Sequence, residues 1–394
     1  MSGNLRVLHA PNIVGGNPPS LAAAERALGL DSRSVSLAGD PFGFGCDELL
    51  WRHGDGRLRR EAQRWRLFRR ALRDFDVIHF NFGESILTWG GLLSGRIGPS
   101  AVDRLRLRFA RHLELVDLPV LRRARKVIAV TYQGDDARQG DFCRAHFPIS
   151  ILDGVEPGYY TPWSDRRKRE RIAKFTHYAH LVYALNPDLL HVLPRAAQFL
   201  PYANVDPAEW RPVAGSLGAR ATPVVLHAPS HRGVKGTEHV IAAVDRLRAE
   251  GVAVELSLVE GVKLEEAKQI YERADVVVDQ LLAGWYGGFA VQAMALGKPV
   301  AAYIRSEDLR FIPQAMREEL PVVNATPQTV YEVLRSLLRS PSSDLAALGQ
   351  RSRAYVERWH DPLKLAARIK ADYERTFAQI HRAAGCTPRL GEGA

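Results

Sequence analysis

Residues 279–300 read DQLLAGWYGGFAVQAMALGKPV and carry the clearest structural signals in the chain. Gly287 and Gly288 precede an apolar stretch of helical length, and Gly297 ends that stretch just before a new run that starts at Pro299. The order strand, glycine-rich loop, helix and strand predicts a parallel α/β sheet. Ligands bind such sheets beyond the carboxyl ends of the strands. The loop at the start of this stretch is therefore a candidate binding site.

Short β-branched runs and longer periodic segments alternate along the chain in two series. Residues 205–221 separate the series and contain the structure breakers Pro207, Pro212 and Gly215. A length of 394 residues also suits two domains of ordinary size. We therefore predict an α/β protein of two Rossmann-like, doubly wound domains. The predicted strands are Leu5–His9, Ser34–Leu37, Val77–Phe80, Lys126–Thr131 and His180–Leu185, then Pro223–His227, Val252–Val259, Asp275–Asp279, Pro299–Ile304 and Pro321–Val323.

Helices are expected between these strands. The clearest covers Thr237–Glu250, with Thr237 as its N-cap and Gly251 as its end. Residues 344–384 have a helical pattern, broken once near Pro362. We predict three units, namely domains at 1–205 and 206–365 and a C-terminal helix in 366–394 that returns to the first domain.

The charge of the chain is basic and unevenly distributed. Its 54 Lys and Arg against 44 Asp and Glu give a formal net charge of +10, most of it in residues 1–213. Segment 57–73 reads RLRREAQRWRLFRRALR and predicts a basic amphipathic helix. Such a helix can lie on an anionic membrane surface, or it can be an ordinary surface helix packed on the sheet. Nucleic acid is the weakest candidate partner, because no nucleic-acid motif is present.

Cysteine usage and hydropathy favour a cytoplasmic protein. Cys46, Cys143 and Cys386 are far apart and lack metal-ligand spacing, so we expect neither a disulfide framework nor a metal site. The sequence contains no signal-peptide pattern and no apolar run of spanning length. We expect a cytoplasmic location, with contact to the inner face of the membrane as an alternative through segment 57–73.

The loop 227–237, HAPSHRGVKGT, follows the first strand of the second series. It places Arg232, Lys235 and a helix N-terminus at one strand end. Two cations and free backbone amides together suit a diphosphate. The same residues could form only a solvated basic loop. Ser230 lies in this loop and is a further candidate contact.

Two other glycine-rich loops follow predicted strands. Gly15 and Gly16 come after the first strand and suit either a tight turn or a phosphate or sugar contact. In the 279–300 stretch, Gly287 and Gly288 can present bare amides to a phosphate. Tyr286, beside Trp285, could cover a sugar or base with its ring, although aromatic residues at a helix start more often pack in a core.

Several of these motifs together resemble the donor half of GT-B glycosyltransferases, in particular the retaining family 4, or group 1. The motifs are Arg232 with Lys235-Gly236, the turn Tyr286-Gly287, the helix 292–300 (QAMALGKPV), and the hinge 201–212 (PYANVDPAEWRP). The resemblance implies a GT-B fold, with an acceptor-side first domain and a nucleotide-sugar-binding second domain. It also implies transfer of a sugar from a nucleotide-diphosphate sugar to an acceptor hydroxyl, with retention of anomeric configuration and without a metal or other cofactor.

The resemblance also assigns roles to residues. Arg232 and Lys235 are expected to stabilise the leaving diphosphate of a co-substrate with UDP or GDP as the expected nucleotide. The loop 259–262 is expected to read the base. The expected donor contacts are Gly15, Gly16, Ser230, Glu260, Asp279, Tyr286, Gly287, Gly288, Phe289 and Gln292. The family typically has two glutamates seven residues apart, whereas this chain has Gly284 and Gln292 at these positions.

Two first-domain loops are expected to face the same cleft. They are residues 79–84 (HFNFGE) and 131–138 (TYQGDDAR). The candidate acceptor-side residues are Asn81, Gln133, Asp135, Asp136 and Arg138. An Asp–Arg pair at this spacing can equally brace a turn.

Three functions remain open at this stage. A glycosyltransferase is favoured, and a nucleotide-sugar epimerase on the same fold is the second enzyme hypothesis. A phosphorylase on this fold is disfavoured, because phosphorylases of this architecture carry pyridoxal phosphate on a lysine and the sequence offers no convincing lysine for it. A catalytically degenerate nucleotide-binding protein is the third, because Gly284 and Gln292 depart from the family pattern.

Overall fold

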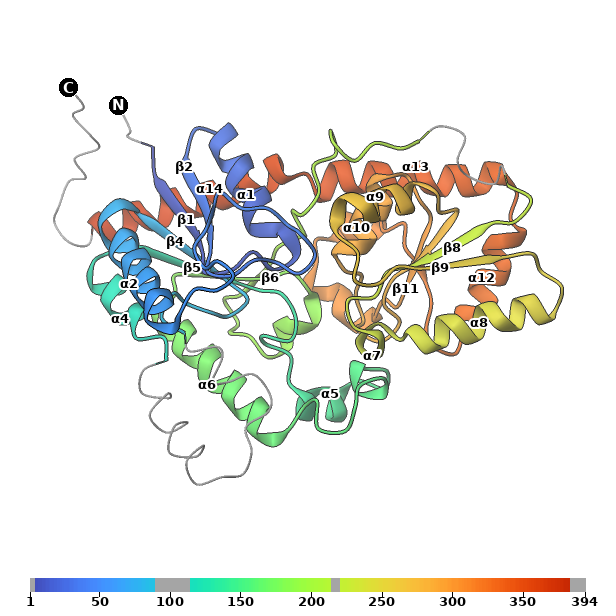
Figure 1. The fold of residues 1–394 in the computed structure, drawn as a ribbon, viewed down its shortest axis with the longest axis horizontal. Coiled ribbons are helices and arrows are strands. Elements are labelled where there is room, and N and C mark those ends of the chain that lie inside the picture. The colour runs from blue at the N-terminus through green and yellow to red at the C-terminus, as the bar shows by residue number, and fades with distance from the viewer. Residues whose placement is uncertain (1–3, 89–113, 214–219, 383–394) are drawn as a thin grey trace.

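The first half of the chain forms a parallel sheet of seven strands. The computed structural model describes residues 4–88, 114–213 and 220–382 (Figure 1). The strand order in this sheet is β3-β2-β1-β4-β5-β6-β7. Register pairs include Val7 with Val77 and Val77 with Val127. The strands are β1 (Arg6–Ala10), β2 (Asp31–Ser36), β3 (Glu48–Leu49), β4 (Val77–Asn81), β5 (Val127–Tyr132), β6 (Leu181–Ala184) and β7 (Gln198–Phe199).

Helices cover both faces of this sheet because its strands are apolar on both sides. The face that carries Leu8, Ile78 and Ile128 packs against Leu67 and Phe68 of α2. The opposite face, with Val7, Val77 and Val127, packs in the cluster that contains α1 and the last helix of the chain. The helices are α1 (Asn17–Ala27), α2 (Arg57–Asp74), α4 (Asp117–Arg123), α5 (Gly140–His146) and α6 (Pro162–Tyr178), with short 3-10 helices η1 (Val14–Gly16), η3 (Ile151–Asp153) and η4 (Pro187–His191).

The second half forms a parallel sheet of five strands in the order β12-β11-β10-β8-β9. The strands are β8 (Val224–His227), β9 (Glu255–Leu258), β10 (Val276–Val278), β11 (Val300–Ala302) and β12 (Val323–Asn324). The helices and 3-10 helix around it are α7 (Arg232–Lys235), α8 (Thr237–Ala249), α9 (Leu264–Glu272), α10 (Gly288–Ala295), η5 (Ser306–Phe311), α11 (Gln314–Glu318), α12 (Val330–Arg339) and α13 (Ser342–Trp359).

The last helix, α14 (Pro362–Arg382), leaves the second domain and packs on α1 of the first (Figure 1). Tyr183 of β6 donates a hydrogen bond to Asp372 of α14 at 2.8 Å. His360 is buried at the break between α13 and α14, where it contacts the carbonyl of Tyr202 at 2.8 Å and the hydroxyl of Tyr286 at 2.9 Å. Burial lowers the pKa of His360 to about 4, so this ring is neutral near pH 7.

Both doubly wound sheets confirm the predicted fold class, and each predicted strand overlaps an observed one. The two-residue strands β3 and β7 were not predicted, since runs so short have no periodicity to read. Thr237 does not cap α8: Gly236 is the N-cap residue, and the Thr237 hydroxyl instead bonds to His227 at 2.9 Å. Gly251 follows the end of α8 with φ of +79°, as glycine at a helix end often does.

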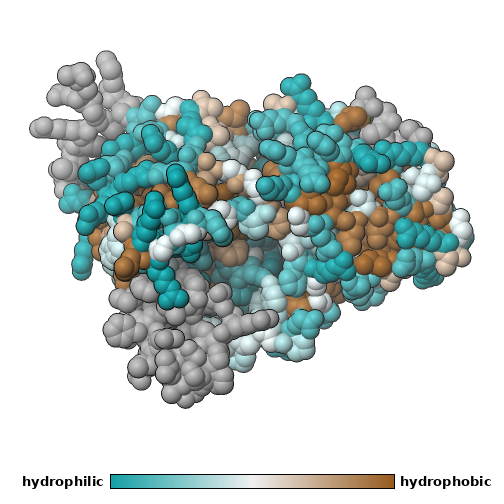
Figure 2. Space-filling model, viewed as in Figure 1, coloured by the Kyte–Doolittle hydropathy of each residue, from teal (hydrophilic) through white to brown (hydrophobic). Residues whose placement is uncertain are grey.

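Segment 57–73 forms the expected helix, α2, which buries Leu67 and Phe68 but leaves the apolar Leu58 and Trp65 exposed. Hydrophilic side chains cover much of the first domain on the face shown in Figure 2, whereas apolar residues gather over the second domain. Among the described residues, no helix is long and apolar enough to cross a membrane.

Candidate functional site between the two sheets

A cavity of about 360 Å³ lies between the two domains. Gly15 of the first domain and Ser230, Lys235 and Gln292 of the second line it. Its walls come from loops that follow β1, β2, β8 and β9. The cavity is therefore at the carboxyl ends of the strands, which is where the fold places ligands.

Among the described residues that line this cavity, Lys235 is the one with a cationic side chain. Its side chain is only 11% exposed, and its ammonium donates to Asp279 Oδ1 at 2.8 Å. Asp279 lies just past β10, is fully buried, and accepts a second bond at Oδ2 from the amide of Gly287 at 2.6 Å. An ammonium has three N–H donors, so the remaining two can bind a phosphate.

The N-terminus of α10 lies beside Lys235. A Cβ on Gly287 would be 3.0 Å from the Lys235 ammonium, so glycine permits this close approach. Gly288 and Phe289 occupy the first turn of α10 and line the cavity. First-turn amides have no partner within their helix, and the helix dipole favours negative charge there. Lys235 and these amides together suit an anionic group such as a phosphate.

The hinge between the domains contributes Asn204. Its amide nitrogen donates to the carbonyl of Gly288 at 3.3 Å, and a Cβ on Gly288 would approach that nitrogen to 2.7 Å. The other amide atom, Asn204 Oδ1, is buried and has no hydrogen-bond partner among the described residues. Asn204 thus ties the hinge to the start of α10.

Aromatic and apolar side chains form the other walls. Phe289 and Tyr271 line the cavity with their ring centroids 5.0 Å apart. Phe42 and Phe44 enter from the first-domain loop after β2, and the Phe42 carbonyl accepts from the amide of Leu264 at 2.9 Å. A charged end and an apolar end together suit a nucleotide.

The loop with Phe42 and Phe44 was missed as a donor-side element by the sequence reasoning. Its pattern, PFGFGC at 41–46, shows small and aromatic residues but contains no sign that it crosses to α9. Gly16 does not line the cavity; it lies under Phe44, whose ring a Cβ on Gly16 would meet at 2.5 Å. Gly15 lines the cavity directly.

The structure does not bring Arg232 into the cavity lining. The Arg232 side chain is 48% exposed and forms an ion pair with Glu260 at 2.7 Å and with Glu238 at 3.4 Å. Glu260 is held on this rim as well, whereas its neighbours Val259 and Gly261 line the cavity. Hydrogen bonding to Arg232 lowers the pKa of Glu260. The pair forms a charged rim rather than a cavity floor.

The structure corrects the expectation that Tyr286 covers a ligand. Tyr286 and Trp285 are fully buried, and the Tyr286 hydroxyl bonds to Tyr355 at 3.1 Å and to His360. Large aromatic rings stabilise a core most when they are wholly removed from water. Tyr286 therefore anchors the loop before α10 to α13.

The structure explains why position 284 is occupied by glycine. Its φ is +78°, and a Cβ at this position would overlap the guanidinium of Arg305. Arg305 is buried, pairs with Asp308 at 2.8 Å, donates to the Ile149 carbonyl at 2.9 Å and stacks on Phe147. Glycine at position 284, where the resemblance would place a glutamate, thus leaves space for the side chain of Arg305, which bridges the two domains.

The acceptor-side candidates form a buried turn next to the cleft. Arg138 pairs with Asp188 at 2.7 Å and with Asp135 at 3.4 Å, and Asp135 also accepts from the Tyr159 hydroxyl. These bonds satisfy both charges within the protein, which agrees with the turn-bracing interpretation.

Asp136, Gln133 and Asn81 are also buried or partly buried. Asp136 accepts from the amides of Gln133 and Gly134, and burial raises its pKa to about 6. Gln133 lies against Gly15 of the cavity wall: a Cβ added to Gly15 would be 3.4 Å from Gln133 Oε1. The Asn81 carbonyl accepts from Asn12 at 3.1 Å. Of these candidates, Gln133 is the one next to the cavity wall.

Within the described ranges, no three His, Cys, Asp or Glu side chains are grouped as a metal site requires. His227, at the end of β8, lies near the site but bonds to the Val278 carbonyl at 2.8 Å and to Thr237. Burial lowers the pKa of His227.

Two Rossmann-like domains, a cavity at their facing strand ends, and a last helix that returns to the first domain define the GT-B fold of glycosyltransferases. Sucrose-phosphate synthase from Thermosynechococcus elongatus matches with a TM-score of 0.59 and 17% identity over 95% of this chain and 100% of that one. Anabaena HepE in complex with UDP-glucose matches at 0.56 and 12%, over 94% and 100%. The catalytic domain of Arabidopsis thaliana starch synthase IV, bound to ADP and acarbose, matches at 0.56 and 11%, over 96% and 99%. No protein-family model and no curated protein matches the sequence.

Proposed function

We propose that this chain transfers a sugar from a nucleotide-diphosphate sugar to an acceptor hydroxyl and retains the anomeric configuration. The observation that carries the proposal is the placement of Lys235 and the first turn of α10 at one end of an interdomain cavity with aromatic walls. A diphosphate fits the charged end and a base fits the apolar end. Two structures with this fold contain UDP-glucose and ADP, so a nucleoside diphosphate is the first ligand to test.

In the proposed reaction, the acceptor oxygen bonds to the anomeric carbon while the bond from that carbon to the diphosphate oxygen breaks. Attack from the face that the nucleotide leaves retains the configuration. The acceptor proton passes to the leaving phosphate oxygen. Lys235 and the amides of Gly288 and Phe289 stabilise the charge that develops on the diphosphate, which is the main electrostatic requirement of the transition state. No metal is needed for this assignment of roles.

A ligand screen followed by product analysis tests the proposal. A nucleoside diphosphate present at 100 times its Kd should raise the free energy of unfolding by about 2.7 kcal/mol. We expect UDP or GDP to give the largest shift in melting temperature among UDP, GDP, ADP and TDP. The NMR spectrum of the product then reports the anomeric configuration.

The same experiment distinguishes the other two functions. An epimerase converts the nucleotide sugar without an acceptor, so donor-only incubation followed by NMR detects it. A degenerate binding protein shifts its melting temperature with the nucleotide but forms no product, and Gln292→Glu would then be expected to create donor hydrolysis. An inverted product or no nucleotide binding would contradict the proposal.

Helix α2 supports a further proposal, that the chain contacts anionic membranes from the cytoplasmic side. Leu58 is 90% exposed and Trp65 is 50% exposed, on a helix with eight arginines and two acidic residues. Arg66 and Arg69 are exposed and pair with no described residue. Exposed apolar side chains between arginines suit the interface of an anionic bilayer.

Liposome flotation measures this contact. The protein should float with vesicles that contain anionic phosphatidylglycerol at low salt, and the Leu58→Ser, Trp65→Ser double variant should float several-fold less. Trp163→Ala is the matched control, because Trp163 is an exposed tryptophan on α6. No flotation of the parent protein at low salt would leave the arginines as ordinary surface charge.

A further inference from the structure

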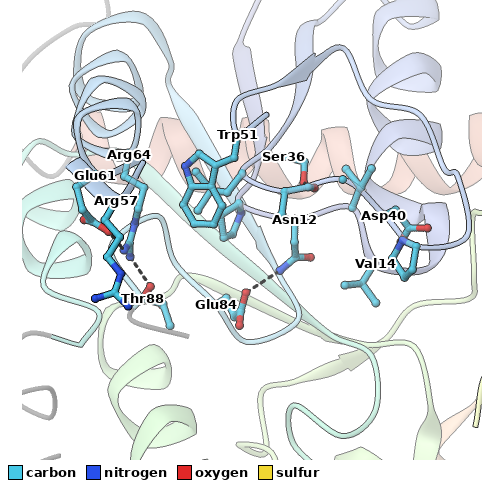
Figure 3. A pocket seen from close by; sticks show the side chains of 16 residues that line it. Asn12, Val14, Ser36, Asp40, Trp51, Arg57, Glu61, Arg64, Glu84 and Thr88 are labelled. Carbon is cyan, nitrogen blue, oxygen red and sulfur yellow. Dashed lines mark hydrogen bonds and ion pairs between the residues drawn. The ribbon is translucent and has the colours of Figure 1, made fainter. Parts of the chain in front are cut away.

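A second cavity, of about 890 Å³, opens in the first domain beside the interdomain cavity. Figure 3 shows its walls: the loop after β1 with Asn12, the loop after β4 with Glu84, and α2 on the far side. Val14, Asp40 and Pro41 line both cavities. A ligand in this second cavity would therefore lie next to one bound at Lys235.

Three carboxylates, which accept hydrogen bonds, are among the described residues that line the second cavity. Asp40, Glu61 and Glu84 line it, and Glu84 Oε2 accepts from the Asn12 amide at 3.2 Å (Figure 3). Each carboxylate oxygen can accept more than one hydrogen bond, so Glu84 retains capacity for ligand hydroxyls. Burial raises the pKa of Asp40.

Two arginines, Arg57 and Arg64, are among the described residues that line this cavity. Arg64 pairs with Glu61 at 2.9 Å and donates to the carbonyls of Ile86, at 3.1 Å, and Thr88. Arg57 is exposed at the start of α2. Among the described residues that line it, three carboxylates therefore face two arginines, of which Arg64 is already bonded, and this balance does not favour an anionic ligand.

Trp51 supplies a flat apolar wall in the same cavity. Figure 3 shows Trp51 among the lining side chains. It is half-buried, and its indole nitrogen donates to the Arg60 carbonyl at 3.3 Å, which fixes the ring. A fixed aromatic ring gives a ligand a large apolar contact at low entropic cost. Acceptors around one aromatic wall suit a pyranose ring, which has hydroxyls at its edge and C–H groups on its faces.

The loop that carries Glu84 is held in an unusual conformation. Phe82 has φ of +57° and Gly83 has φ of +55°, and the first of these is costly for a residue with a side chain. The Phe82 amide donates to Thr131 at 3.0 Å, and Arg171 donates to the Gly83 carbonyl at 2.7 Å. These bonds hold Glu84 toward Asn12, as a preorganised binding group requires.

We propose that this second cavity binds the acceptor, and that the acceptor is a neutral carbohydrate whose hydroxyls donate to Glu84 and whose ring packs on Trp51. The role of this saccharide as an acceptor rests on the proposed function, but its binding to the cavity can be measured without turnover. It also moves the acceptor side away from Asp135 and Arg138, whose charges are satisfied within the protein.

Saturation-transfer NMR on the whole protein without nucleotide tests the binding directly. The probes are the methyl α- and β-glycopyranosides of glucose, galactose and mannose, each at about 10 mM because single sugars bind weakly. At least one should receive saturation from the parent protein. Glu84→Gln and Trp51→Ala should each reduce the effect by about tenfold, which is the size expected for one lost charge-assisted bond or one aromatic contact.

Matched controls separate the cavity from general damage. Glu374→Gln on α14 and Trp163→Ala on α6 change the same residue types at exposed positions outside the cavity and should bind the glycoside like the parent. Nucleotide binding by thermal shift should stay within about twofold in all four variants, since it depends on the other cavity. If the parent protein binds no nucleotide, the proposed function is wrong. The acceptor inference is wrong if none of the glycosides receives saturation from the parent protein, or if Glu84→Gln and Trp51→Ala transfer as much saturation as the parent.

Discussion

Lys235→Ala is expected to weaken nucleoside diphosphate binding by about tenfold or more and to lower the transfer rate further, because removing a donor that acts on developing charge costs about 100-fold or more. Lys235 lines the interdomain cavity, and its ammonium lies beside Gly287 at the start of α10. Isothermal titration with UDP and GDP measures the affinity, and initial rates with the sugar donor measure turnover.

Arg232→Ala is the matched control on the same short helix. Arg232 is on the exposed rim and pairs with Glu260, so its loss should change nucleotide affinity by less than about threefold. Lys235→Ala leaves the buried Asp279 carboxylate unpaired, which can destabilise the fold. Lys235→Met combined with Asp279→Asn removes both charges and keeps the test valid if the single variant does not fold. Unchanged affinity in the double variant would exclude Lys235 from the site.

Gly154→Ala is expected to disturb the contact between the domains. Gly154 follows η3 in the first domain and lies against Gly233 of α7 in the second, and a Cβ at Gly154 would overlap the Gly233 carbonyl oxygen. Backbone cannot yield as a flexible side chain can, so we expect a loss of about 1–3 kcal/mol in the free energy of unfolding. Lys235 lies two residues beyond Gly233, so its displacement should also lower the transfer rate roughly 10- to 100-fold.

Thermal unfolding and transfer rates with the same donor measure both effects. Gly56→Ala is the matched control, because a Cβ there meets nothing within 4 Å and its φ is −69°. Gly154 has φ of −125°, which alanine adopts readily, so any loss reports the interdomain contact and not backbone strain. A Gly154→Ala variant with the stability and rate of Gly56→Ala would show that the two domains do not hold this contact in solution.

Much of the fold could be predicted because its signals are local. β-Branched runs of four to six residues, glycines at helix ends and prolines at strand starts act within a few residues, so both series of strands could be recognised. Gly287 and Gly288 before α10 and Lys235 before α8 are positioned by this same order of elements. The sequence was less informative for β3 and β7, whose two residues each depend on a neighbouring strand.

The partners of individual side chains were not predictable, because they lie far apart along the chain. Lys235 turns to Asp279, 44 residues away, and Arg232 turns to Glu260, 28 residues away, so one cation lines the cavity and the other remains on its rim. Tyr286 lies in the core, where its hydroxyl is hydrogen-bonded to Tyr355 and His360. The loop with Phe42 reaches Leu264 of the other domain.

The sequence alone therefore determined the two doubly wound domains and the strand ends where a ligand can bind, because hydrophobic period and turn chemistry are properties of short segments. The tertiary structure decided which residues face the cavity, why Gly284 must leave room for Arg305, and that a second cavity with Glu84 and Trp51 adjoins the first. These features depend on packing between segments from both domains, and the direction of a side chain is set by the neighbours it meets only after the chain has folded.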